Sequence, residues 1–194
     1  MKVGVLALQG DVREHIRALE RAGASPLEVR YPEQIAGVDA IVMPGGESTT
    51  IGKLLDRFGL LDDLRDRAIS GMPLYGTCAG AILMARTVAG REDAPHRLGV
   101  LDITVTRNAY GRQVDSFEAD LSVTGLGEPF RAVFIRAPVI ESVGDDVEVL
   151  ATHQGHPVLV RQGAMLASTF HPEMTGDNRV HELFLQGFND TVRG

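Results

Sequence analysis

The sequence predicts a three-layer α/β/α domain, in which a mostly parallel open sheet lies between helices and an antiparallel β excursion follows in the second half. In residues 1–90, short apolar runs alternate with segments of helical periodicity. Strands separated by helices pair in parallel through right-handed crossovers. After Gly90 the pattern changes to a series of β-rich runs. A length of 194 residues is typical of one domain, so we expect a single domain over residues 1–194.

In the first half, apolar runs predict strands at residues 2–8, 27–30, 39–43 and 72–77. Asp11 and Glu14 have the spacing of a capping box at the start of a helix that ends near Gly23. Ser48 can cap a second helix, which Gly59 ends. Further helices are expected at about residues 60–70 and 79–88.

The second half is predicted to be mainly β. Strands are expected at about residues 100–107, 114–123, 131–136, 146–151, 157–161 and 164–170. Gln154-Gly155 lies between two of these runs and has the composition of a hairpin turn. The closing helix, at about residues 177–189, has an apolar face formed by Val180, Leu183, Phe184 and Phe188.

Composition excludes several classes of protein. Hydrophobic residues make up 44% of the chain and charged residues 23%, which is too apolar for a disordered protein. The net charge of −7 argues against a general nucleic-acid binder or an anionic-membrane binder. A single cysteine excludes an intramolecular disulfide and a cysteine-based zinc site.

Two apolar segments could be mistaken for targeting or membrane segments. The run at residues 2–8 is too short for a signal peptide and is followed at once by charged residues. Residues 68–85 carry no charged side chain, a length that would admit a membrane span. Three glycines and Pro73 interrupt this segment, so a strand, a turn and a helix fit it better. We therefore expect a cytoplasmic protein with no membrane partner.

The lone cysteine, Cys78, lies in a Gly-x-Cys-x-Gly sequence between a predicted strand and a predicted helix. This arrangement is typical of a nucleophile elbow, in which glycines allow a tight turn that exposes the nucleophile. The helix N-terminus favours a thiolate, and the backbone N–H of Ala79 would point to where an oxyanion forms. A small, buried and inert cysteine is the alternative.

A nucleophilic cysteine needs a base, and the base needs a group that orients it. His171 follows a strand-like run, and Pro172 favours an extended backbone at His171. In extended chain, residues i and i+2 project the same way, so Glu173 can lie beside the imidazole. A Cys–His–Glu triad is therefore possible. An ordinary exposed loop is the alternative for this segment.

Met43-Pro44-Gly45-Gly46-Glu47-Ser48-Thr49-Thr50 lies at another predicted strand end. Paired glycines allow a backbone N–H to approach a ligand closely, so Gly46 is a candidate second oxyanion donor. A phosphate-binding loop fails on spacing, because five residues separate Gly46 from Gly52 and Leu54 follows Lys53. A simple turn before a helix is the remaining alternative.

The other histidines give no metal pattern, so we predict no metal. His153 and His156 flank the predicted hairpin turn and have no accompanying ligand pattern. His15, His96 and His181 are expected at the surface of helices or loops.

Together these segments resemble the glutaminase subunits of pyridoxal 5′-phosphate synthase, a family of class I glutamine amidotransferases, over essentially the full length. The most specific markers are Ala40–Thr50, Gly76–Gly80 and Thr169–Glu173. Supporting segments are Leu8–Asp11 with Glu14-His15, Arg107–Gln113, Ser116–Glu118 and Phe134–Pro138. The resemblance implies a class I glutamine amidotransferase-like fold.

The resemblance also implies roles for individual residues. Cys78 would attack the side-chain amide carbon of L-glutamine, with His171 and Glu173 completing the triad. The N–H groups of Gly46 and Ala79 would stabilise the oxyanion. The residues implied in glutamine binding are Gly46, Glu47, Ser48, Arg107, Ile135 and Arg136. No cofactor is implied.

The partner implied by the resemblance is a (βα)₈-barrel synthase subunit in a dodecamer-based complex. This subunit would use the released ammonia to make pyridoxal 5′-phosphate. Part of the interface is expected at Gln9, Gly10 and Asp11. We further expect the oxyanion hole to be incomplete until the partner binds.

Three alternatives remain at this point. The chain could be the glutaminase subunit of another amidotransferase, although the Gly-Gly-Glu-Ser-Thr-Thr segment is not expected there. It could be a redox-sensing or chaperone-like protein with a cysteine elbow, which would leave His171-Pro172-Glu173 unexplained. It could also be a catalytically silent subunit that only binds the synthase.

Overall fold

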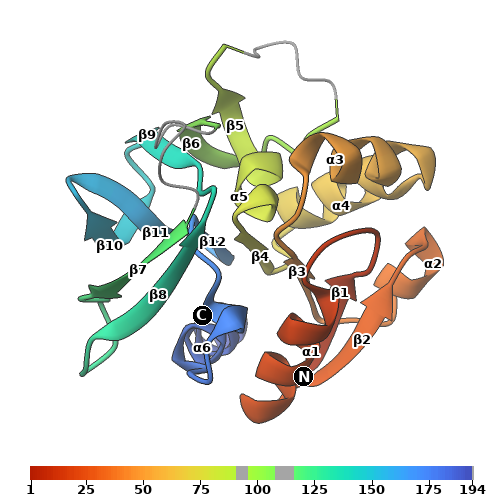
Figure 1. The fold of residues 1–194 in the computed structure, drawn as a ribbon. Coiled ribbons are helices and arrows are strands. Elements are labelled where there is room, and N and C mark those ends of the chain that lie inside the picture. Colours follow the sequence, from red (N-terminus) through yellow and green to blue (C-terminus); the bar gives the residue numbers. More distant parts are fainter. Residues whose placement is uncertain (91–95, 108–115, 194) are drawn as a thin grey trace.

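The computed structural model describes residues 1–90, 96–107 and 116–193, with side chains through residue 187. Predictions for residues 91–95 and 108–115, and for the side chain of Phe188, lie outside the described residues. The α/β prediction is confirmed (Figure 1). The strands are β1 Lys2–Leu6, β2 Ser25–Val29, β3 Ala40–Met43, β4 Leu74–Thr77, β5 Ala85–Val88, β6 Leu101–Thr106, β7 Ser116–Leu121, β8 Phe130–Ile135, β9 Val139–Val143, β10 Glu148–His153, β11 His156–Gln162 and β12 Met165–Ser168. The helices are α1 Val12–Arg21, α2 Pro32–Ile35, α3 Ser48–Arg57, α4 Leu60–Ile69, α5 Ala79–Met84, the 3₁₀ turn η1 Pro172–Met174 and α6 Arg179–Arg193.

The central sheet has the strand order β10-β11-β12-β4-β3-β1-β2 within the described residues. All neighbouring strands from β12 to β2 pair in parallel. The β10–β11 and β11–β12 pairs are antiparallel. The predicted mostly parallel sheet is therefore present, with its antiparallel strands at one end.

Two apolar cores cover the two faces of this sheet. Side chains alternate between faces along each strand. In β3, Ile41 and Met43 pack with α3, α4 and α5, whereas Ala40 and Val42 pack with α1, α6 and the β7–β8 hairpin. The result is the predicted three-layer arrangement, visible in Figure 1 as helices on both sides of the sheet.

Two further small sheets are present in the described part of the chain, β5-β6-β9 and β7-β8. The β6–β9 and β7–β8 pairs are antiparallel, as predicted for this half, whereas β5 and β6 pair in parallel. β6, β9 and the β7–β8 ribbon lie beside the end of the central sheet that carries β10 (Figure 1). The predicted hairpin turn is confirmed, since His153 pairs with His156, and Gln154 and Gly155 have φ values of 50° and 83°.

Several local predictions are wrong. The helix predicted at about 79–88 ends at Met84, because the next residues form β5 and pair with β6. Val139–Val143 forms a strand that the apolar pattern did not indicate. The capping box at Asp11 does not form, because the Asp11 side chain makes no capping bond and faces His171 instead. Glu47, rather than Ser48, caps α3, and its carboxylate accepts the N–H groups of Thr49 and Thr50.

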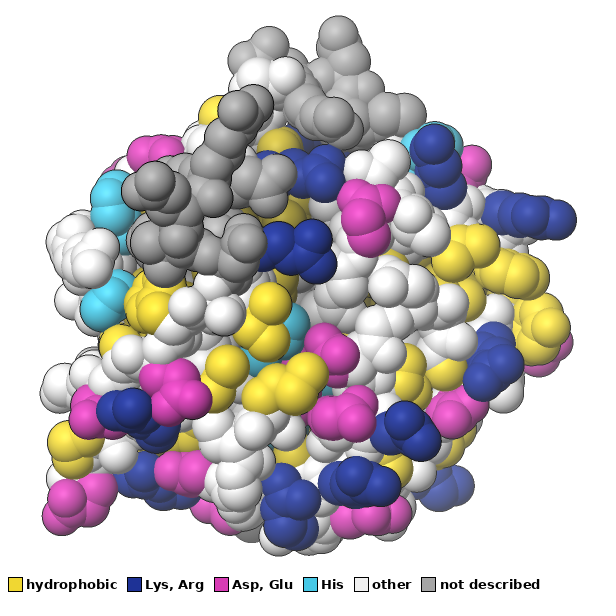
Figure 2. Space-filling model, in the orientation of Figure 1, with side chains coloured by type: hydrophobic (Ala, Val, Ile, Leu, Met, Phe, Trp, Pro, Cys, Tyr) yellow, Lys and Arg dark blue, Asp and Glu magenta, His cyan; other side chains and the backbone are white. Residues whose placement is uncertain are grey.

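Within the described residues, no helix has the length and apolar character needed to cross a membrane. The apolar segment at residues 68–85 instead supplies the end of α4, then β4 and α5. Figure 2 shows acidic and basic side chains interspersed over one face of the molecule, with no extended basic patch on that face.

The glycines around Cys78 are required by close packing. A Cβ on Gly76 would lie 2.6 Å from the carbonyl carbon of Gly80. A Cβ on Gly80 would overlap the carbonyl oxygen of Met43 on β3. Neither glycine has a positive φ, whereas Cys78 itself does. The elbow therefore depends on glycine for space, so that α5 can lie directly against β3 and β4.

We expect Gly80→Ala to lower the free energy of unfolding by about 1–3 kcal/mol, because β3 and α5 must separate to admit the methyl group. Gly37→Ala is the control, since a Cβ there meets only the carbonyl of Gln34 at 3.6 Å. Its stability should stay within about 1 kcal/mol of wild type. Urea denaturation followed by circular dichroism measures both. Equal stability of the two variants would contradict the packing argument.

Candidate active site

The site lies where three adjacent parallel strands end. β12, β4 and β3 are neighbours in the sheet, so their carboxyl ends meet at one edge. β3 is followed by the Gly45-Gly46 loop, β4 by Cys78, and β12 by the segment that reaches His171. Crevices at this edge of open α/β sheets are the usual ligand sites. Topology thus joins motifs that are far apart in the sequence.

Cys78 occupies the turn between β4 and α5 with φ 47° and ψ −99°, a rare conformation for a residue other than glycine. Its N–H donates to the carbonyl of Ser168 at 2.8 Å, which joins the turn to the end of β12. Its Sγ lies 3.9 Å from the carbonyl oxygen of Ile135. The prediction of a strand–turn–helix around Cys78 is confirmed.

His171 and Glu173 form a buried pair, with Nδ1 2.7 Å from Glu173 Oε1. An ionised carboxylate only accepts, so His171 donates from Nδ1 and its Nε2 is left for other partners. The backbone path differs from the prediction, because Glu173 lies in the 3₁₀ turn η1 rather than in an extended chain. The turn nevertheless brings the carboxylate to the imidazole.

The electrostatics of this pair favour the charged forms. Burial alone would lower the pKa of His171, but hydrogen bonds with Cys78 and Glu173 and the Glu173 charge raise it to about 10. For Glu173, burial would raise the pKa, but electrostatic and hydrogen-bonding contacts with His15 and His171 hold it well below its usual range. His171 is therefore an imidazolium at neutral pH.

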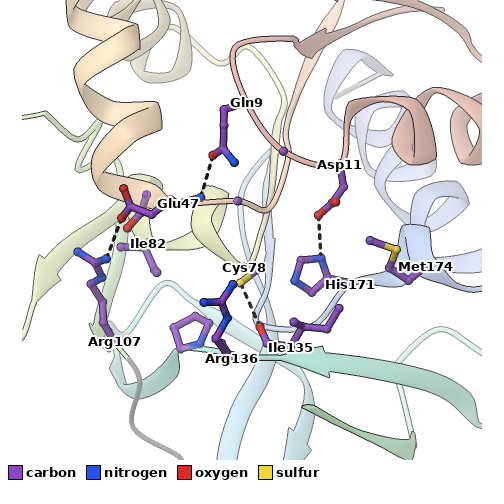
Figure 3. A pocket seen from close by; sticks show the side chains of 14 residues that line it. Gln9, Asp11, Glu47, Cys78, Ile82, Arg107, Ile135, Arg136, His171 and Met174 are labelled. Atoms are coloured by element: carbon purple, nitrogen blue, oxygen red, sulfur yellow. Dashed lines mark hydrogen bonds and ion pairs between the residues drawn. The ribbon is translucent and has the colours of Figure 1, made fainter. Parts of the chain in front are cut away.

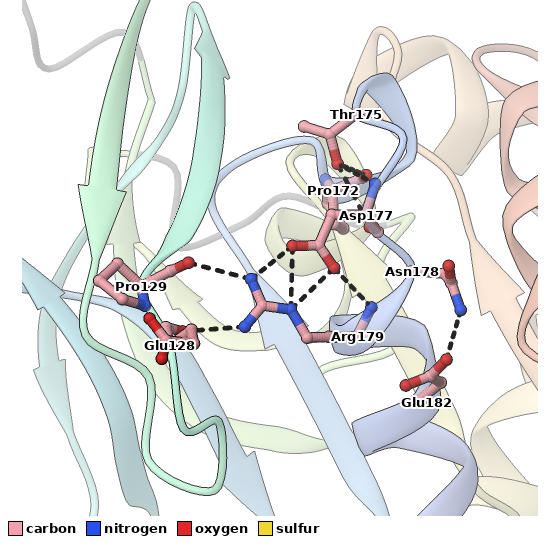
Figure 4. Close-up of polar contacts among 8 residues, drawn as sticks. All are labelled: Glu128, Pro129, Pro172, Thr175, Asp177, Asn178, Arg179 and Glu182. Atoms are coloured by element: carbon pink, nitrogen blue, oxygen red, sulfur yellow. Dashed lines mark hydrogen bonds and ion pairs between the residues drawn. The ribbon is translucent and has the colours of Figure 1, made fainter.

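A polar network fixes the chain on both sides of η1, and Figure 4 shows the contacts that follow the turn. The His171 N–H donates to the carbonyl of Val133 on β8 at 2.8 Å. Beyond the turn, Thr175 donates to the Pro172 carbonyl at 3.0 Å. Arg179 binds Asp177 and the carbonyls of Glu128 and Pro129. The start of α6 is thereby tied to the β7–β8 hairpin, and the His171–Glu173 segment is held between them.

A cavity of about 460 Å³ opens over Cys78 (Figure 3). This volume suits a small-molecule ligand. The lining residues are Gln9, Gly10, Asp11, Gly46, Glu47, Ser48, Cys78, Ile82, Arg107, Ile135, Arg136, Pro138, His171 and Met174. Every predicted site residue therefore lines it except Glu173, which lies behind His171, and Ala79, which is buried at the start of α5.

Two arginine side chains line this cavity, and they differ in their hydrogen-bond partners. Arg107 donates to Thr49 Oγ1 and to Glu47 Oε1, both at 3.0 Å. Glu47 also caps α3, and its hydrogen bonds with Thr50 and Thr49 lower its pKa to about 2 despite the opposing effect of burial. Arg136 makes no hydrogen bond or ion pair with any other described residue. It is thus the cation in this site that is open to a ligand.

The segment Gln9–Asp11 touches the site at three successive residues. Gln9 accepts the Glu47 N–H at 2.8 Å, beside Gly46. Gly10, with φ 105°, packs so closely on Gly45 that a Cβ would overlap the Gly45 carbonyl. Asp11 lies 3.5 Å from His171 Nδ1. Displacing this segment would disturb the glycine loop and His171 together.

The prediction that His15 and His181 lie at the surface is wrong, because both are fully buried. His15 contacts Glu173, and burial is the largest influence that lowers the pKa of His181 to about 3. Asp11 and His15 are four residues apart and share one helix face, a signal that could have placed His15 at the site. Ile82, Pro138 and Met174 also line the cavity and were not predicted.

Asp11, His171 and Glu173 place possible metal ligand atoms within 4.8 Å of one another. However, the proton on His171 Nδ1 is already shared with Glu173 at 2.7 Å. A metal on this nitrogen would have to displace that bond. We therefore interpret the cluster as a hydrogen-bonded group.

The fold matches that of a solved glutamine amidotransferase. A crystal structure described as a glutamine amidotransferase superposes with a TM-score of 0.92 at 55% identity, covering 96% of this chain and 98% of that one. A structure of PurLQS from Thermotoga maritima superposes with a TM-score of 0.70 at 18% identity, covering 98% of each chain, and shows the fold alone. The fold and the cysteine site thus define an α/β protein of the glutamine amidotransferase class.

The sequence comparison is more specific, and the chain belongs to the SNO glutamine amidotransferase family, whose model matches residues 5–190. A relative in Mycobacteroides abscessus, named pyridoxal 5′-phosphate synthase subunit PdxT, is 60% identical over 183 residues. The match covers 94% of this chain and 95% of that protein. A PdxT of Kosmotoga olearia is 54% identical over 187 residues, covering 96% and 97% of the two chains.

The raised pKa of His171 makes stability depend on pH. A folded-state pKa of about 10 exceeds the ordinary histidine pKa of 6.5. Protonated His171 therefore contributes stability that is complete below about pH 6.5 and is lost as the pH rises through 10. The lowered pKa of Glu173 acts in the opposite direction, so its contribution is lost only in acid. We expect the loss of unfolding free energy in His171→Asn to be largest near pH 6 and to shrink towards pH 10.

Urea denaturation at intervals from pH 6 to 10 measures this difference. His156→Asn is the control, because the His156 side chain on the β10–β11 hairpin makes no hydrogen bond or ion pair with the described residues. Its effect on stability should vary little over the same range. A His171→Asn effect that is constant from pH 6 to 10 would contradict the assignment.

Proposed function

We propose that this chain hydrolyses L-glutamine to L-glutamate and ammonia, as the glutaminase subunit of a pyridoxal 5′-phosphate synthase. The observation that carries the proposal is the strained Cys78 turn, which opens into a cavity beside the buried His171–Glu173 pair. Relatives up to 60% identical over nearly their whole length are named subunits of that synthase.

In the proposed reaction, the Cys78 sulfur attacks the side-chain amide carbon of glutamine and forms a tetrahedral oxyanion. His171, held as an imidazolium by Glu173, gives its proton to the departing nitrogen, so ammonia leaves and a glutamyl thioester remains. The neutral imidazole then takes a proton from water as the water attacks the thioester. Collapse of the second tetrahedral intermediate releases glutamate and restores the thiolate–imidazolium pair.

The backbone N–H groups of Gly46 and Ala79 are the proposed oxyanion donors. Removing one such donor typically costs a factor of 10²–10³ in rate. Arg136 is proposed to bind the α-carboxylate of glutamine, since it lines the cavity and makes no hydrogen bond or ion pair with another described residue. Arg107, which Glu47 and Thr49 hold in place, is proposed to support it. Glu47 thus acts on glutamine mainly through Arg107, with Ser48 and Ile135 completing the lining.

We propose that a (βα)₈-barrel synthase subunit, in a dodecamer-based complex, docks in part on Gln9, Gly10 and Asp11 and activates the site. Gln9 already accepts the Glu47 N–H next to Gly46, so the glycine loop is held by the segment that the partner would contact. Docking would release or reorient this loop and complete the oxyanion hole. The ammonia would then pass to the synthase for pyridoxal 5′-phosphate formation.

The principal test measures glutamate release from glutamine, with and without the synthase subunit, for wild type and Cys78→Ala. We expect release only from wild type in the presence of the partner, because the thiol forms the covalent intermediate and the partner completes the site. Cys78→Ala should reduce the rate by at least about 10³-fold. Size-exclusion chromatography should show that this variant still binds the partner.

The other outcomes decide between alternatives. Equal glutamate release without the partner would support the glutaminase activity and contradict its activation by docking. Binding of the synthase subunit without any glutamate release would indicate a catalytically silent subunit. Release that a different synthase activates, and this one does not, would indicate another amidotransferase.

A second prediction concerns substrate binding. Arg136→Gln should raise KM for glutamine by about 10- to 100-fold, because a charge-assisted bond to the α-carboxylate contributes roughly 1.5–3 kcal/mol. Arg131→Gln on β8, the strand that ends just before Arg136, is the control, since Arg131 is exposed and pairs with Glu118 and Asp120 among the described residues. Its KM should match wild type. A normal KM in Arg136→Gln would remove Arg136 from the proposed substrate site.

A further inference from the structure

A buried polar chain continues behind Glu173, on the side away from the cavity. Glu173 Oε1 lies 2.7 Å from His171 Nδ1 and 3.5 Å from His15 Nε2. His15 Nε2 also lies 3.1 Å from Thr77 Oγ1, and His15 Nδ1 lies 3.1 Å from His181 Nε2. His15, Thr77 and His181 are each fully buried. The chain therefore joins α1, β4 and α6 to the carboxylate that faces the proposed base.

The proton positions in this chain follow from its partners. An ionised Glu173 can only accept, so His15 carries a proton on Nε2. His181 is neutral, because burial lowers its pKa to about 3. A proton on His181 Nε2 then points to His15 Nδ1, and His181 Nδ1 is left as an acceptor. This agrees with the lack of a hydrogen-bond partner for His181 Nδ1.

We propose that His15 is a positioning residue for the glutaminase reaction, because its Nε2–H holds the Glu173 carboxylate in the place and charge state from which Glu173 orients His171. This inference rests on the proposed function. His15 touches neither the cavity nor the reacting atoms and acts only through Glu173.

Glu173 needs such a second donor. Its other oxygen, Oε2, is buried without a hydrogen-bond partner, so the side chain is held through Oε1. A buried carboxylate held by one donor alone is costly to keep ionised. Asp11 also lies 3.5 Å from His171 Nδ1 and is a competing acceptor. By holding Glu173 from behind, His15 keeps His171 paired with Glu173 at 2.7 Å.

The titratable groups around Glu173 come from several elements. His15 belongs to α1, Asp11 precedes it, Tyr75 belongs to β4 and His181 to α6. Burial raises the pKa of Glu173, and His15 is the first opposing influence, followed by His171. Asp11 and Tyr75 supply no positive charge, and His181 is neutral. Loss of the His15 donor should therefore raise the pKa of Glu173 and weaken the imidazolium of His171.

Two isosteric variants separate the two ends of the His15 ring. In His15→Gln the side-chain amide lies near the former Nε2 and can donate to Glu173. In His15→Asn it lies near the former Nδ1 and cannot reach Glu173. Tyr75→Phe is the matched control, since it removes a buried hydrogen bond to Ser168 in the same core without removing a donor to Glu173.

Two readouts are measured from pH 4 to 9. One is kcat and KM for glutamine with the synthase subunit, and the other is the alkylation rate of Cys78 by iodoacetamide in the full chain alone. For His15→Asn we expect kcat to fall about tenfold with KM within about twofold, and the acid limb of both profiles to move up by about one pH unit. His15→Gln should retain most of the wild-type kcat, and the acid limb of both pH profiles should lie at the wild-type pH. Tyr75→Phe should match wild type in both profiles.

The inference is overturned if the acid limb of the pH profiles does not move in His15→Asn, or if kcat falls equally in His15→Gln and His15→Asn. It is also overturned if the loss of kcat among the variants simply follows their loss of thermal stability. Histidine ¹⁵N NMR of the wild type needs no variant to fold, and a His15 Nε2 without a proton between pH 6 and 8 would also overturn it. The alkylation profile needs no glutaminase activity. If the acid limb of the Cys78 alkylation profile moves in His15→Asn but the protein never releases glutamate, the proposed function is rejected and the positioning role of His15 is supported.

Discussion

The positive φ of Cys78 is the constraint on which the rest of the site depends. A non-glycine residue in such a conformation costs roughly 1–3 kcal/mol, so the surrounding structure must hold it there. The bond from the Cys78 N–H to the Ser168 carbonyl supplies one restraint, and the packing of Gly76 against Gly80 supplies another. Because Ser168 ends β12, the same restraint places the chain that continues to His171 next to the thiol. One strained turn therefore sets the positions of both Cys78 and His171.

The buried charges near this turn are stable only as a group. His171 would lose its proton if it were buried alone, and Glu173 would gain one. Each charge keeps the other in place, and His15 joins them from the opposite side of the carboxylate. The network around Arg179 then limits how far the His171–Glu173 segment can move. Catalytic electrostatics and local rigidity are thus produced by the same contacts.

The sequence predicted the parts of the site that depend on strand ends and missed those that depend on packing between distant elements. The Gly45-Gly46 loop, Cys78 and His171 each follow an apolar run, so local pattern placed them at one edge of the sheet. The burial of His15 could not be read from α1, because Thr77 and His181, from β4 and α6, cover it. The ion pair of Glu47 with Arg107 was missed for a related reason, because it joins residues sixty positions apart in the chain.

The beginning of α1 contacts the His171–Glu173 pair from two sides. Asp11 faces His171 from the cavity side, while His15, one turn later, faces Glu173 from behind. Gln9, just before the helix, holds the Glu47 N–H beside the proposed oxyanion glycine. A shift of this one segment would alter the oxyanion loop, the competing carboxylate and the support of Glu173 at the same time. A partner that docks on Gln9–Asp11 would therefore need no contact with glutamine to control the reaction.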